Sequence, residues 1–181
     1  MAVDTFYFDG HTSITDPGGV WTNDSNVFDG STTTNAVASS NGSTSSNYLE
    51  GQGTNASGIT GTITQVRARI RGYSALDNGY EYSAYDTLNE PSGGWSLAAV
   101  QDLEVRIWRT GGVVSRLANF AVYEDGDAGG TILGQEATTL PGSSSPTIVE
   151  VEVTWTEGET YLLLESGGAI FQEGGDLIEI E

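Results

Sequence analysis

The chain has 181 residues, 25 acidic side chains against six basic ones, a formal net charge of −19 and no cysteine. The composition excludes a disulfide framework and thiolate chemistry, and the charge argues against nucleic acid or an anionic membrane as a partner. The length suits one domain, which we take as residues 1–181. The 25 glycines, with abundant Ser, Thr and Asn, favour short strands joined by turns.

Lysine is absent, and all six basic residues are arginines that lie between Arg67 and Arg116. In this respect the composition resembles that of proteins from halophilic archaea and their viruses. At about 1 M salt the Debye length falls to about 3 Å, so surface carboxylates no longer repel one another strongly. The alternative is the acidic surface of an ordinary mesophilic protein.

Two aromatic residues near the start of the chain, Trp21 and Phe28, are predicted to anchor a core, with a tight turn at Asp29-Gly30. The segment from Trp21 to Ala36 resembles the opening of β-sandwich modules in virion proteins of tailed viruses. It also resembles discoidin-type carbohydrate-binding modules, which share a Phe-Asp-Gly turn.

The stretch Gln65–Tyr73 alternates apolar and basic side chains, which predicts a strand with one buried face. Its outer face carries Arg67, Arg69 and Arg71. Two interpretations are open: cross-strand ion pairs with carboxylates on neighbouring strands, or docking against an acidic neighbouring subunit. Exposed ion pairs contribute only about 0–1 kcal/mol, so we name these arginines as interface residues.

Three tyrosines follow in the next segment, at Tyr80, Tyr82 and Tyr85. Clustered exposed tyrosines are typical of surfaces that contact proteins or sugars, and we add these three to the predicted interface. The alternative is that they pack at the rim of the sandwich.

A Pro-Ser-Gly-Gly turn leads to Trp95, a third predicted core anchor, and Ser96 is predicted to cap a short helical turn near residues 96–101. A strand over Asp102–Arg109 follows. The block from Pro91 to this strand also resembles β-sandwich proteins of tailed viruses. The strand Ile63–Ile70 fits the same pattern, and together with the segment from Trp21 to Ala36 the resemblance spans about residues 15–110.

The acidic glycine loop between residues 124 and 130 contains Asp125 and Asp127, which are candidate ligands for a structural cation such as calcium or magnesium. A solvated turn is the alternative interpretation, and no other cofactor is predicted.

Further along the chain, Thr147–Thr156 alternates cleanly and places Trp155 inward as the fourth core anchor. The full pattern predicts an all-β fold, an antiparallel jelly-roll-like β-sandwich.

The sequence predicts no enzyme. It has no cysteine, no lysine and a single histidine, His11, and it lacks a Gly-x-Ser-x-Gly elbow. Two carboxylates would suffice for a glycosidase, but the sequence singles out no pair. No apolar run approaches the ~20 residues of a membrane helix, and the first twenty residues show no secretory signal.

The resemblance implies a structural or surface protein of a tailed-virus particle, such as a capsid decoration, a turret or a tail-fibre attachment module. Such a protein would be a homo-oligomer that docks to capsid or tail proteins. It would be assembled in the host cytoplasm and exposed on the virion, with a host surface glycan as a further candidate partner. The main alternative is a carbohydrate-binding module that uses Tyr80, Tyr82 or Trp95 as a stacking platform. A third is an archaeal surface-layer or pilus component.

Overall fold

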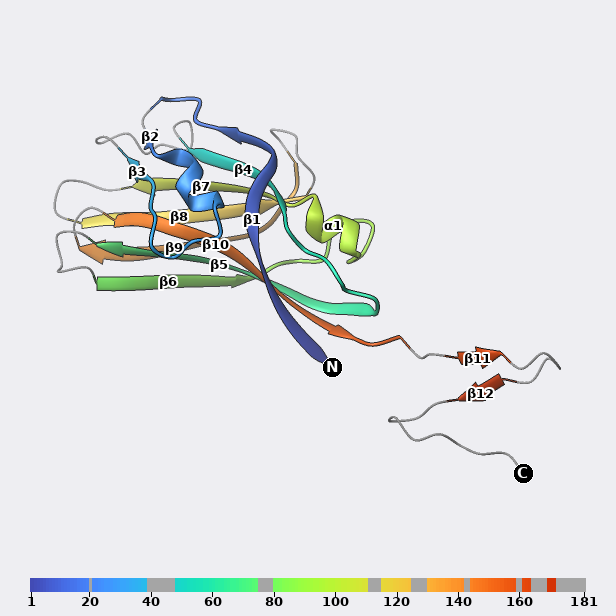
Figure 1. Cartoon of the computed structure of the whole chain (residues 1–181). Helices are drawn as coiled ribbons and strands as arrows, with labels where there is room; N and C mark the ends of the chain where they lie inside the picture. The colour runs from blue at the N-terminus through green and yellow to red at the C-terminus, as the bar shows by residue number, and fades with distance from the viewer. Residues whose placement is uncertain are drawn as a thin grey trace.

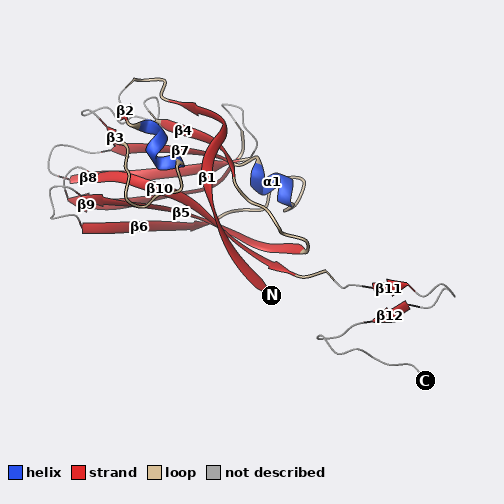
Figure 2. Cartoon of the chain, in the orientation of Figure 1, coloured by secondary structure: helices blue, strands red, loops and turns tan. Residues whose placement is uncertain are grey.

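The computed structural model describes residues 1–19, 21–38, 48–74, 80–110, 115–124, 130–141, 144–158, 161–163 and 169–171. Strands dominate the described chain, with one short α-helix and one 3-10 turn beside them (Figure 2). The predicted cation ligands Asp125 and Asp127 lie outside the described residues.

Eight strands form one antiparallel sheet, in the order β6-β5-β10-β1-β4-β7-β8-β9 (Figure 1). This architecture confirms the predicted all-β, antiparallel, sandwich-like fold. The strands are β1 (Ala2–Thr15), β4 (Leu49–Thr54), β5 (Thr62–Ser74), β6 (Tyr80–Thr87), β7 (Glu104–Thr110), β8 (Ser115–Tyr123), β9 (Ile132–Pro141) and β10 (Ser144–Thr156).

Strand β1 connects the two layers of the sandwich. Its first half, Ala2 to Tyr7, pairs with β10, and its second half pairs with β4. The register shifts between Phe8 and Ser13, and Gly10 in this interval has a φ of 60°. A bulge of this kind bends a strand and increases its twist, so one strand serves both layers.

The sheet nearly closes on itself where its two edge strands meet. Asn89, just after β6, donates hydrogen bonds from its backbone N and Nδ2 to the carbonyl oxygen of Leu133 in β9, at 2.8 and 2.9 Å. The backbone N of Gln135 donates to Oδ2 of Asp86 at 2.7 Å. The fold is therefore barrel-like at this end, and these contacts cover strand edges that would otherwise be exposed.

The core follows from the alternation of the strands. In β5, Val66, Ala68 and Ile70 are fully buried, while the arginines between them lie on the outer face. The inward residues of β10 and β7 continue the same core, and Phe8 and Phe120 fill its centre at 0% exposure.

The segment from β2 (Trp21–Thr22) through η1 (Asp24–Phe28) to β3 (Val37–Ala38) packs on β1 and β10. Trp21 and Phe28 join the core from this segment, and Phe28 occupies the space that a side chain at Gly51 would need. The turn glycine Gly30 has a φ of 72°, which favours glycine, and it packs on the ring of Tyr7.

Helix α1 (Leu97–Gln101) forms where the sequence predicts a helical turn, and it lies at one end of the strands (Figure 1). Oγ of Ser96 accepts a hydrogen bond from the backbone N of Ala99 at 3.0 Å, which is an N-cap. Trp95 is partly buried against the core, and Trp155 is 8% exposed within it.

A separate hairpin follows the barrel. Strands β11 (Tyr161–Leu163) and β12 (Ala169–Phe171) pair with each other and lie apart from the eight-stranded sheet (Figure 1).

Candidate functional site

The first candidate surface is the outer side of β5 and β10, which we call the arginine face. It consists of Arg67, Arg69, Arg71, Tyr85, Glu150 and Glu152. The strand register places Glu152 opposite Arg67 and Glu150 opposite Arg69. Arg67 Nη1 lies 3.2 Å from Glu152 Oε1, and Arg71 Nη1 lies 3.5 Å from Glu150 Oε1. Arg69 pairs with the same Glu150, which is therefore shared by two guanidinium groups.

Tyr85 of β6 completes the arginine face. Its hydroxyl accepts a hydrogen bond of 2.6 Å from Arg69 Nη1. Its ring centroid lies 4.9 Å from the guanidinium carbon of Arg67 and 5.2 Å from that of Arg69, within cation–π range. Burial alone would lower the pKa of Arg69, but its hydrogen bonds to Tyr85 and Glu150 raise it. Arg69 therefore keeps its charge, while Tyr85 remains 38% exposed.

The arginines of β5 therefore form ion pairs with carboxylates of the neighbouring strand, which was one of the two interpretations of the sequence. Docking of these arginines against another subunit stays a prediction. The three predicted tyrosines do not share one set of strand positions. The register places Tyr85 opposite Arg69. Tyr80 and Tyr82 pair with Ser74 and Gly72, at the positions of β5 that alternate with the arginines. The side chains of Tyr80 and Tyr82 lie outside the described part of the structure.

A second ionic group, the Arg106 cluster, lies on the outer side of β4 and β7 and was not predicted from the sequence. It consists of Tyr48, Glu50, Gln52, Glu104, Arg106 and Tyr123. Arg106 Nε lies 2.8 Å from Glu50 Oε2 and 2.8 Å from Glu104 Oε1. Glu104 is 0% exposed and Glu50 is 7% exposed, although both are carboxylic acids on an outer face.

Two tyrosines cover the guanidinium of this cluster. The centroids of Tyr48 and Tyr123 lie 4.6 and 4.7 Å from the guanidinium carbon of Arg106. Burial would lower the pKa of Arg106, but the hydrogen bond to Glu50 and the charge of Glu104 raise it. Arg106 therefore keeps its positive charge and makes cation–π contacts with both tyrosine rings.

Among the described residues of this cluster, one cation faces two buried carboxyl groups, so their charges do not balance. The Arg106 N–H donates to Glu50, and among the described residues Glu104 Oε1 and Arg106 Nη2 have no hydrogen-bond partner. Burial raises the pKa of Glu104, and the neighbouring Glu50 raises it further, against the lowering effects of Gln52 and Arg106. The carboxyl of Glu104 is therefore protonated more readily than that of an exposed glutamate.

The sequence carried only half of the signal for this cluster. Glu104 and Arg106 alternate with the inward residues of β7, which identifies them as an outward pair. Glu50 and Gln52 lie in a glycine-rich stretch far away in the chain, and only the register of β4 against β7 brings Glu50 opposite Arg106.

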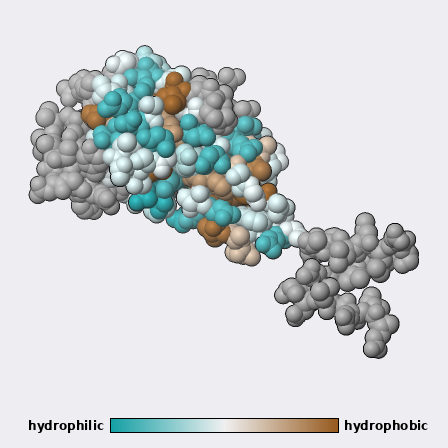
Figure 3. All heavy atoms as spheres, in the orientation of Figure 1, coloured by the Kyte–Doolittle hydropathy of each residue, from teal (hydrophilic) through white to brown (hydrophobic). Residues whose placement is uncertain are grey.

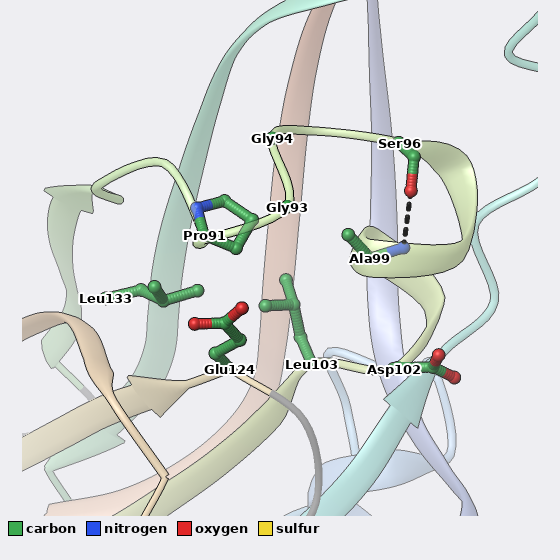
Figure 4. Close-up of a pocket in the computed structure, with 9 residues that line it drawn as sticks. All are labelled: Pro91, Gly93, Gly94, Ser96, Ala99, Asp102, Leu103, Glu124 and Leu133. Carbon is green, nitrogen blue, oxygen red and sulfur yellow. Dashed lines mark hydrogen bonds between the residues drawn. The ribbon is translucent and has the colours of Figure 1, made fainter.

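A pocket of about 210 Å³ lies between the turn at 91–94, α1 and the start of β9 (Figure 4). The carboxylate of Glu124 points into it between Leu103 and Leu133. This carboxylate already accepts hydrogen bonds from the backbone N and Oγ of Ser92, at 3.1 and 2.8 Å. We therefore assign Glu124 the role of fixing the turn.

A larger hollow of about 320 Å³ lies on β7, β8 and β9, and we call it the Trp108 hollow. It is lined by Trp108, Asn119, Phe120, Gln135 and Glu136. The register pairs Trp108 with Asn119 directly across the two strands, and Asn119 Nδ2 lies 3.4 Å from the carbonyl oxygen of Trp108. Trp108 is partly exposed, and Gln135 and Glu136 are exposed.

Among the described residues, no group of three or more acidic or histidine side chains converges in a way that could hold a metal ion. In the same part of the chain, none of the helices has the length and apolar character needed to cross a membrane. No protein family, curated protein or solved structure shows significant similarity to the chain.

Proposed function

We propose that this protein is a non-enzymatic structural or surface component of a particle of a tailed virus that infects a halophilic archaeon. It acts by assembling with copies of itself and by docking to the particle, as a capsid decoration, a turret or a tail-fibre module. The observation that carries this proposal is the arginine face, where Tyr85 and its charged neighbours are held in place on the barrel wall.

The arginine face has the composition of a binding surface. Tyrosine and arginine are enriched among the residues that contribute most to protein interfaces. Tyr85 is exposed, yet it is fixed by Arg67 and Arg69, so much of its side-chain freedom is lost before any partner binds. Preorganisation of this kind lowers the entropic cost of association.

The charge pattern of the face suits a second copy of the chain. The arginines of β5 and the two glutamates of β10 form neighbouring columns of opposite charge. Two copies that meet through this face in a symmetric arrangement bring the arginine column of each against the glutamate column of the other. The partner to which we commit is therefore another copy, with capsid or tail proteins as later partners.

The arginine face consists of charged side chains and one tyrosine, so polar contacts supply much of the proposed binding. On the side seen in Figure 3, hydrophobic residues are scattered in small groups among hydrophilic ones. The net charge of −19 repels other copies at low ionic strength, whereas multimolar salt screens that repulsion. Assembly is therefore expected to require high salt.

The test is the light-scattering mass of the protein on a sizing column, at multimolar and at physiological salt. We expect a closed oligomer at high salt that dissociates at low salt. Tyr85→Ala is expected to leave a folded monomer at high salt. Ile132→Ala is the control, because Ile132 is 47% exposed on β9, outside the arginine face. A wild-type monomer under both conditions overturns the proposal.

A second candidate function is that of a carbohydrate-binding module. The observation that favours it is the Trp108 hollow, where one indole and two amide side chains meet on an outer face. Of the platform predicted from the sequence, Trp95 packs against the core, and the side chains of Tyr80 and Tyr82 lie outside the described part of the structure.

A further inference from the structure

We propose that the Trp108 hollow binds a neutral saccharide, with Trp108 as the surface on which a sugar ring stacks. The inference rests on the second candidate function and is independent of assembly through the arginine face. Glycan binding and oligomer mass are measured separately, so either proposal can fail without the other.

The size of the hollow suits a small carbohydrate. Its volume of about 320 Å³ falls at the lower end of the roughly 300–1,000 Å³ that is common for small-molecule sites. It can therefore hold one or two sugar units rather than a long chain. The remaining units of a glycan would extend into solvent.

The chemistry of the lining matches both sides of a sugar ring. A pyranose has an apolar face of C–H groups, which packs on an aromatic ring, and hydroxyl groups around its edge. Trp108 supplies the aromatic surface and is partly exposed. Gln135 carries an exposed amide that both donates and accepts hydrogen bonds, as sugar hydroxyls require, and the amide of Asn119 lies next to Trp108 across the strand pair.

The charge at the Trp108 hollow favours uncharged sugars over acidic ones. Among the described residues that line the hollow, Glu136 is acidic and none is basic. The whole chain carries a net charge of −19. Sialic acids, uronic acids and phosphorylated sugars would meet a repulsive site. The ligand that fits is therefore uncharged.

The strands hold the lining in place before a ligand arrives. Trp108 and Asn119 face each other across β7 and β8, and the backbone of Gln135 is tied to Asp86 at the barrel closure. Arg106 lies two positions before Trp108 in the same strand, and its pairing with Glu50 fixes that part of β7. A rigid site on strands gives better-defined recognition than a site on loops.

The experiment is an array of neutral and acidic glycans, followed by calorimetric titration with the best neutral ligand. We expect wild-type binding to neutral glycans and weaker binding to a sialylated form of the same glycan. Trp108→Ala should weaken binding at least tenfold, and Trp108→Phe, which keeps an aromatic ring, should weaken it less. Gln135→Ala should weaken binding severalfold.

Gln65→Ala is the matched control for Gln135→Ala, because Gln65 is an exposed glutamine on β5 that does not line the hollow. It should bind like the wild type. Circular dichroism and thermal unfolding show whether each variant is folded. The proposal is overturned if the wild type binds no neutral glycan at millimolar concentration. It is equally overturned if Gln135→Ala and Trp108→Ala, both folded, bind as tightly as the wild type.

Discussion

At the scale of single residues, the most unusual group is the carboxyl of Glu104. It is 0% exposed, next to another buried carboxyl and a single guanidinium. Its raised pKa means that the folded protein binds a proton there more tightly than the unfolded chain does. Stability from this group is therefore fully present below the ordinary carboxyl pKa of 4.5 and is lost as the pH rises through the raised value.

Glu104→Gln should remove this pH dependence, because the amide imitates the protonated carboxyl at every pH. We expect the free energy of unfolding of the wild type, relative to the variant, to fall as the pH rises above 4.5. Denaturant unfolding between pH 4 and pH 8 measures the difference. Glu157→Gln, at an exposed position, is the control and should show no such trend. Parallel curves for wild type and Glu104→Gln would contradict a raised pKa.

A backbone contact at Gly61 gives a second prediction at this scale. A Cβ at this position would lie 1.7 Å from the carbonyl oxygen of Thr156, and backbone cannot move aside easily. Gly61→Ala should therefore destabilise the fold by at least about 1–3 kcal/mol, as in overpacked sites. Gly93→Ala meets nothing within 4 Å and should stay within about 0.5 kcal/mol of the wild type. Denaturant unfolding measures the free energy of unfolding of the two variants. Equal stabilities would contradict a close approach between residue 61 and the carbonyl oxygen of Thr156.

At the scale of elements, strands β5 and β10 pair along most of their length, and their ion pairs differ in burial. The side chain of Glu150 is 11% exposed and serves both Arg69 and Arg71, whereas that of Glu152 is 34% exposed and serves Arg67. A buried carboxylate that accepts charged hydrogen bonds contributes more than an exposed one.

Glu150→Gln should therefore cost more stability than Glu152→Gln. We expect roughly 1.5–3 kcal/mol for the first and about 0–1 kcal/mol for the second. Both are isosteric changes on one strand, so each serves as the control for the other in denaturant unfolding. Equal losses would show that burial does not separate the two pairs.

At the scale of the whole molecule, charge dominates. The chain has a net charge of −19 and no lysine, so repulsion between its carboxylates destabilises the folded state unless salt screens that repulsion. The small barrel buries its core by nearly closing the sheet, with β6 and β9 joined through Asp86, Asn89 and Leu133. The fold must hold this closure against the repulsion.

Salt should consequently raise the stability of the isolated protein. We expect the unfolding midpoint on heating to rise steadily from physiological to multimolar sodium chloride. An equal osmolality of sucrose is the control, because it changes solvation without screening charge. A midpoint that rises as much in sucrose as in salt, or that is flat in salt, would favour the acidic mesophilic interpretation.

Much of the local structure could be predicted from the sequence. The alternation of Gln65–Tyr73 and Thr147–Thr156 identified the cores of β5 and β10, and the Ser96 cap placed α1. These signals are local, because the backbone turns successive side chains to opposite faces of a strand. The full length of strand β1 is not apparent from the sequence, because its bulge interrupts the alternation.

The sequence by itself determined the fold class, the extreme charge and the alternation that sets three arginines on one outer face. The tertiary structure alone decided which strands are neighbours. Glu50 meets Arg106, and Asp86 meets Gln135, only because burial of the core selects one strand order and one register. Local periodicity fixes which way a side chain faces, but the contacts between distant segments depend on how the whole sheet closes.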